Sequence, residues 1–133
     1  MMKFAAAYVA TAIVMLALDA LWLGVIAKPL YQQGIGHLMA ERPNLAAAAL
    51  FYAVYALGIV IFAVAPQALD SWGRAAVTGA LFGAIAYATY DLTNLATLKQ
   101  WPLSLACIDI AWGSVVSAVS AAAGRLALEQ MAS

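Results

Sequence analysis

Charged side chains are scarce in this sequence. Only 9% of its 133 residues are Asp, Glu, Lys or Arg, whereas a soluble domain usually carries about 25%. Six Lys and Arg balance six Asp and Glu, so there is no basic excess to attract nucleic acid. Twelve charges cannot cover a globule of this size, and 67% of the residues are hydrophobic. The composition therefore argues against a soluble monomer and a nucleic-acid partner, and it indicates an integral membrane protein.

Residues that most catalytic motifs need are also scarce. The single cysteine, Cys107, has no second cysteine with which to form an internal disulfide or a Cys-x-x-Cys site. The single histidine, His37, cannot supply the usual set of His ligands for zinc. No Gly-rich phosphate loop, His-Glu-x-x-His motif or nucleophile elbow is present. No cofactor is predicted from these residues, and whether the protein is an enzyme stays open.

What the sequence does have is four long apolar stretches. They cover residues 4–26, 45–65, 75–98 and 103–128, and each exceeds the roughly 20 residues that a helix needs to cross a bilayer. The stretches are continuously apolar rather than alternating, which favours helices over the strands of a barrel. All four prolines lie between the stretches or at their edges. We expect an all-α, polytopic membrane protein, a four-transmembrane-helix bundle that forms one integral membrane domain over residues 1–133.

The segment between the first two stretches predicts a further, shorter helix. Apolar side chains recur at helical spacing in residues 27–44, which is typical of a helix lying in the membrane interface. We call the membrane face that holds residues 27–44 and 99–102 side B, and the opposite face side A. Lys and Arg divide three against three between the two faces, so the positive-inside rule leaves the absolute topology open. A fixed topology and a dual topology with an antiparallel dimer are both compatible with this count.

Three aspartates lie inside the predicted spans. Asp19, Asp91 and Asp109 are each six or seven residues from the side B end of a span. At 1.5 Å per residue, all three lie roughly 10 Å below side B, and Tyr52 of the second span lies at the same depth. An Asp at mid-span costs roughly 2.5–3.5 kcal/mol on insertion scales, so such residues face the bundle interior. The sequence therefore predicts one buried polar layer near side B.

Other polar side chains follow the same layer. Asp19-Ala-Leu-Trp22 and Asp109-Ile-Ala-Trp112 repeat one pattern in spans of opposite direction, and the i,i+3 spacing predicts that each Trp stacks beside its own acid. His37 is either a proton relay above the acids or a hydrated interfacial residue. The candidate ligand- or ion-binding residues are Asp19, Asp91, Asp109, Asn94, Tyr52, Tyr87, Tyr90, Trp22, Trp112 and His37.

Two runs carry a resemblance to a known family. They are Tyr-Asp-Leu-Thr-Asn…Trp-Pro, from Tyr90 to Pro102, and Asp-Ile-Ala-Trp-Gly, from Asp109 to Gly113. The chain resembles a bacterial family of small four-helix integral membrane proteins that carries a domain-of-unknown-function label. The resemblance implies a multi-pass protein of the bacterial inner (cytoplasmic) membrane. It implies no activity, so no catalytic role passes to any residue.

Three functions of the acid layer stay open. Intramembrane acids bind protons and cations, which favours proton or cation handling or small-molecule transport. Buried acids also fix helix register, as in an accessory or scaffold subunit of a membrane complex. As a third alternative, Asp19, Asp91 and Asp109 would hold a divalent cation in a lipid-modifying enzyme. The expected partners are the lipid bilayer and either a second copy in a homo-oligomer or another membrane protein.

Overall fold

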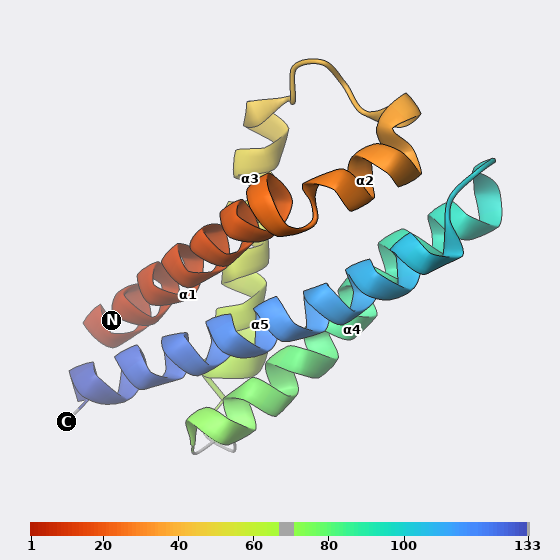
Figure 1. Ribbon diagram of the computed structural model, residues 1–133. Coiled ribbons are helices and arrows are strands. Elements are labelled where there is room, and N and C mark those ends of the chain that lie inside the picture. The colour runs from red at the N-terminus through yellow and green to blue at the C-terminus, as the bar shows by residue number, and fades with distance from the viewer. Residues whose placement is uncertain (67–70, 133) are drawn as a thin grey trace.

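The computed structural model describes residues 1–66 and 71–132, and these ranges contain helices and no strand. Four helical spans are long and apolar enough to cross a membrane, Met2–Ile26, Leu45–Val64, Trp72–Thr97 and Leu103–Met131. The predicted all-helical membrane fold is thereby confirmed. In chain order the elements are α1 (Met2–Leu21), the π-helical turn η1 (Trp22–Ile26), α2 (Lys28–Ile35), the 3-10 turn η2 (Gly36–Leu38), α3 (Leu45–Ile59), the π-helical turn η3 (Val60–Val64), α4 (Trp72–Thr97) and α5 (Leu103–Ala132) (Figure 1).

Side-chain caps set where two of the spans begin. Asn44 Oδ1 accepts a hydrogen bond from the backbone N–H of Ala47 at 3.0 Å, at the predicted start of α3. Ser71 Oγ accepts from the N–H of Arg74 at 3.2 Å. This cap satisfies an otherwise free donor in the first turn, so α4 begins three residues before the predicted apolar stretch.

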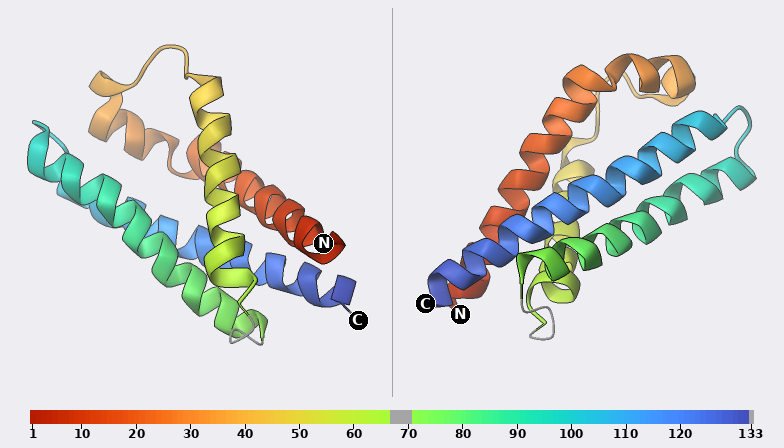
Figure 2. Two further views of the ribbon diagram at one scale, coloured as in Figure 1. Left: turned by 180° about the vertical axis from the view of Figure 1, so that it is seen from behind. Right: turned by 60° about the horizontal axis from the view of Figure 1, so that its bottom comes forward.

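Helix α5 is the centre of the bundle. It lies between α1 and α4 and runs antiparallel to both, as the views of Figures 1 and 2 agree. A Cβ atom added to Gly83 of α4 would come within 2.2 Å of the Gly113 carbonyl oxygen of α5. On the other side of α5, a Cβ on Gly124 would come within 2.1 Å of Thr11 Oγ1 in α1. Glycines therefore allow both neighbours to approach the α5 backbone closely, as the Gly-x-x-x-Gly spacing of Gly79 and Gly83 indicates.

Helix α3 crosses the other three spans at a steep angle (Figure 2). Near the middle of the bundle, the Tyr55 hydroxyl shares a hydrogen bond of 2.7 Å with Ser117 Oγ of α5. Farther toward side A, Phe62 of η3 stacks on Phe82 of α4, with ring centroids 5.9 Å apart. Because α3 is inclined, its first half diverges from α4 on side B.

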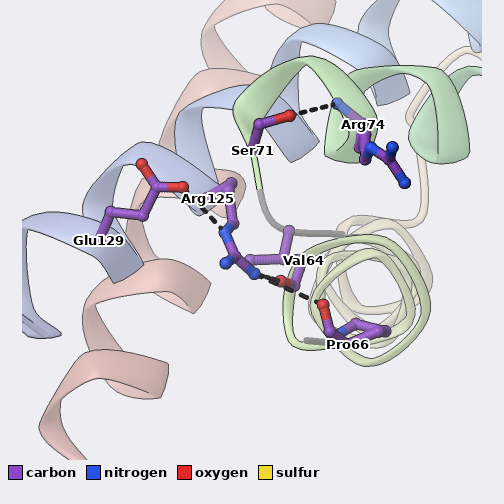
Figure 3. A network of polar contacts seen from close by, with 6 residues as sticks. All are labelled: Val64, Pro66, Ser71, Arg74, Arg125 and Glu129. Atoms are coloured by element: carbon purple, nitrogen blue, oxygen red, sulfur yellow. Dashed lines mark hydrogen bonds and ion pairs between the residues drawn. The ribbon is translucent and has the colours of Figure 1, made fainter. Parts of the chain in front are cut away.

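An arginine fixes the side A end of this crossing (Figure 3). Arg125 Nη1 of α5 donates to the carbonyl oxygen of Val64 at 2.9 Å and to that of Pro66 at 3.5 Å. Its Nε donates to Glu129 Oε1 at 3.1 Å. A cation at the carboxyl end of a helix satisfies free carbonyls and complements the helix dipole. Arg125 therefore ties α5 to the end of η3.

The outer surface of the bundle is apolar. On α4, Val77, Leu81 and Ile85 follow one another at four-residue spacing, and each is more than half exposed. The same holds for Leu50 and Val54 on α3. Such stripes are typical of helix faces that are turned to lipid chains or to another membrane-embedded chain.

The contact between α4 and α5 gives the first prediction. Gly83→Ala places a methyl group against the α5 backbone, and we expect the free energy of unfolding to fall by about 1–3 kcal/mol. The measurement is reversible unfolding in mixed micelles. Gly24→Ala is the matched control, because a Cβ atom there meets nothing within 4 Å. Equal stability of the two variants would contradict the described packing.

Candidate functional site

A cavity of about 510 Å³ lies beneath α2, toward side B. Among the residues that the structure describes, Asp19 and Asp109 are its only acidic lining residues, and no Lys, Arg or His lines it. The remaining wall is largely aromatic. Each of the helices α1 to α5 contributes to the lining. The lining consists of Asp19, Leu23, Tyr31, Ile35, Phe51, Tyr52, Tyr55, Ala86, Tyr87, Tyr90, Asp109 and Trp112.

Asp19 joins three helices. Its side chain projects from α1 and is only 5% exposed. One carboxylate oxygen accepts a hydrogen bond of 2.8 Å from the Tyr52 hydroxyl of α3, and the other accepts one of 2.7 Å from Trp112 Nε1 of α5. Both oxygens of this buried acid are therefore satisfied by side chains from other helices.

Asp109 joins the surface helix to the bundle. Its carboxylate accepts a hydrogen bond from the Tyr31 hydroxyl of α2, and that hydroxyl in turn accepts one of 3.2 Å from Trp22 Nε1. Burial and the bond to Asp109 raise the pKa of the Tyr31 phenol well above its ordinary value. Tyr31 therefore stays neutral and remains a donor at physiological pH. The apolar stripe of α2 thus faces into the bundle and covers the cavity.

The two Asp-x-x-Trp patterns are crossed. Trp22 and Trp112 stack in parallel, with ring centroids 4.5 Å apart and an interplanar angle of 6°. The expectation that each Trp stacks beside its own acid was wrong, because Trp112 donates to Asp19 of α1 and Trp22 reaches Asp109 of α5 through Tyr31. Antiparallel helices explain the exchange. A step of three residues along the chain leads toward side B in α1 but toward side A in α5. Each indole therefore lies level with the acid of the other helix.

Asp91 differs from the other two acids. It is 1% exposed, does not line the cavity, and neither of its oxygens accepts a hydrogen bond from a described donor. It interacts electrostatically with the Asp109 carboxyl group. Within residues 1–66 and 71–132, no three His, Cys, Asp or Glu side chains are close enough to hold a metal ion. Asp91 and Asp109 thus form a pair, and Asp19 is separate from it.

The other candidate residues divide into those at the cavity and those away from it. Tyr52, Tyr87 and Tyr90 line it together with Trp112, and Trp22 packs behind Trp112. Asn94 and the exposed His37 do not line it. Sequence reasoning missed Tyr31 as a site residue. Its signal was a hydrogen-bonding aromatic side chain on the apolar stripe of the interfacial segment, directly above the predicted acid layer.

The comparisons with known proteins give one match, which covers most of the chain. A family model described as "Predicted membrane protein (DUF2177)" matches residues 4–126. The chain belongs to the DUF2177 family. The match spans every residue that lines the cavity. No curated protein and no solved structure matches the chain.

The bond between α2 and Asp109 gives the second prediction for this DUF2177 protein. Tyr31→Phe removes the donor and leaves a buried carboxylate without it, so we expect the free energy of unfolding to fall by about 1–3 kcal/mol. Tryptophan emission should change as well, because Trp22 loses its acceptor. Tyr90→Phe is the matched control: it removes the same atom from another cavity tyrosine, whose hydroxyl makes no described hydrogen bond. An equal free energy of unfolding in the two variants would show that Tyr31 does not hold α2.

Proposed function

We propose that this protein binds a small organic cation in the side B cavity and moves it through the membrane. The observation that carries the proposal is the charge of the lining. Asp19 and Asp109 face a hollow with no described basic residue, inside a medium that screens charge poorly. A cation would complement this lining, whereas an anion would be repelled.

The aromatic wall supports an organic cation. Phe51, Tyr52, Tyr55, Tyr87 and Trp112 line the cavity with the acids. The face of an aromatic ring attracts a positive charge, and several rings together form the cages that bind quaternary ammonium groups. Such groups carry weakly held water, so they lose little on entering an apolar hollow. The volume of about 510 Å³ falls in the usual range for small-molecule sites.

The link between the cavity and α2 supports movement rather than static binding. Tyr31 lines the cavity and also holds α2 to Asp109. A cation paired with Asp109 competes with the Tyr31 hydroxyl for the same carboxylate. Binding would therefore loosen α2, the element that covers the cavity on side B, and would couple occupancy to opening.

A scaffold role is the second candidate, and Asp19 favours it. Each Asp19 oxygen already accepts a hydrogen bond from a different helix. Such an acid fixes helix positions whether or not a ligand is present. The scaffold and carrier proposals separate at Asp109, which only the carrier needs as a ligand for the cation.

Tetramethylammonium is the test ligand for the third prediction. Purified protein in nanodiscs should change its tryptophan emission on titration, because Trp112 lines the cavity, and proteoliposomes should take up the labelled cation. Asp109→Asn removes the charge but keeps an oxygen that accepts from Tyr31, and we expect at least about a tenfold loss of affinity. Glu41→Gln is the matched control, since Glu41 is exposed on the same side of the membrane, outside the cavity.

Two results would contradict the carrier proposal. One is equal affinity of wild type and Asp109→Asn. The other is binding without uptake in proteoliposomes, which would leave the scaffold role as the better account.

A further inference from the structure

We infer that the ligand is a single-chain amphiphile, with a cationic head in the acidic cavity and an alkyl chain in a second hollow between α3 and α4. This inference rests on the proposed function and specifies its substrate class. The second hollow is an apolar groove of about 640 Å³. Within residues 1–66 and 71–132 its lining contains no charged residue and consists of Ala47, Leu50, Phe51, Val54, Tyr55, Gly58, Phe62 and Phe82.

The groove and the cavity adjoin. Phe51 and Tyr55 line both of them, and their rings stack with centroids 5.3 Å apart. Phe51 is 45% exposed, so this boundary lies at the surface of the bundle rather than in its core. One molecule can therefore lie across this pair of rings, with its charged end among the acids and its apolar end along α3.

The groove leads away from the cavity toward side A. Its lining runs from Ala47 to Phe62, which corresponds to about 22 Å along α3, measured from side B toward side A. The cavity meets the groove at Phe51 and Tyr55, and the part from Tyr55 to Phe62 corresponds to about 10 Å along α3. An amphiphile with its cationic head among the acids would therefore extend its chain from these rings toward Gly58 and Phe62, away from side B.

Phe82 is the residue of α4 that faces the groove. A Cβ atom on Gly58 would come within 3.1 Å of Phe82 Cζ, so the absence of a side chain at Gly58 lets the Phe82 ring lie against α3. An apolar chain lying along α3 would therefore contact this ring as well as the side chains of α3.

The experiment compares tetramethylammonium with butyl-, octyl- and dodecyltrimethylammonium in nanodiscs. Each affinity is corrected by subtracting the ligand bound to protein-free nanodiscs and is referred to the free concentration in water. We expect the corrected affinity to rise with chain length, because each methylene that is fully buried raises the affinity roughly fourfold. Val54→Trp fills the groove beside the shared rings from an exposed position, so it should weaken dodecyltrimethylammonium by at least about tenfold, the equivalent of two methylenes. Tetramethylammonium should bind this variant within about twofold of wild type, since it needs only the cavity.

Leu57→Trp is the matched control. Leu57 is also an exposed apolar residue of α3, but it does not line the groove. Equal weakening of dodecyltrimethylammonium by the two tryptophan variants, or a corrected affinity that does not rise with chain length, overturns the amphiphile inference. The proposed function then stands if tetramethylammonium binding still depends on Asp109. Failure of every member of the series to bind overturns both.

Discussion

The crossed pairing of two acids and two indoles is the constraint on which the rest of the site depends. Asp19 and Trp112 join α1 to α5 directly, and the stacked Trp22 continues the contact toward side B. In the hydrocarbon region no water competes for these groups, and helices gain little from hydrophobic association, so polar contacts and close packing decide how they dock. Because the pairing fixes both the rotation and the relative depth of α1 and α5, it also fixes where every other side chain of the site can lie.

The remaining elements attach to this core from three directions. Tyr52 brings α3 to Asp19, and Tyr31 brings α2 to Asp109. Helix α4 attaches by close packing instead, through Gly83 against the α5 backbone. The two tyrosine attachments lie toward side B and the Gly83 contact lies near the middle of the bundle, while α3 is tied to α5 on side A by Arg125. An inclined α3, held at both ends, leaves the hollow spaces that the proposed function uses.

Composition and spacing predicted the class of protein, the four spans and the presence of buried acids, since each follows from one helix taken alone. The partners of the indoles could not be predicted in the same way. They depend on the offset in depth between antiparallel helices, which shifts each Trp from its own acid to the other one. Tyr31 was missed because an interfacial helix can turn its apolar stripe toward lipid or toward the bundle. Depth alone also could not show that Asp91 lies beside Asp109 but outside the cavity.

The most direct test of this account is a double-mutant cycle between Asp19 and Trp112, measured by reversible unfolding in mixed micelles. Asp19→Leu and Trp112→Phe each remove one partner of the 2.7 Å hydrogen bond and place an apolar side chain at that position. We expect a coupling free energy of about 1 kcal/mol or more, because the bond joins two helices out of water. A cycle that is additive within about 0.3 kcal/mol would contradict the claim that this pairing sets the structure.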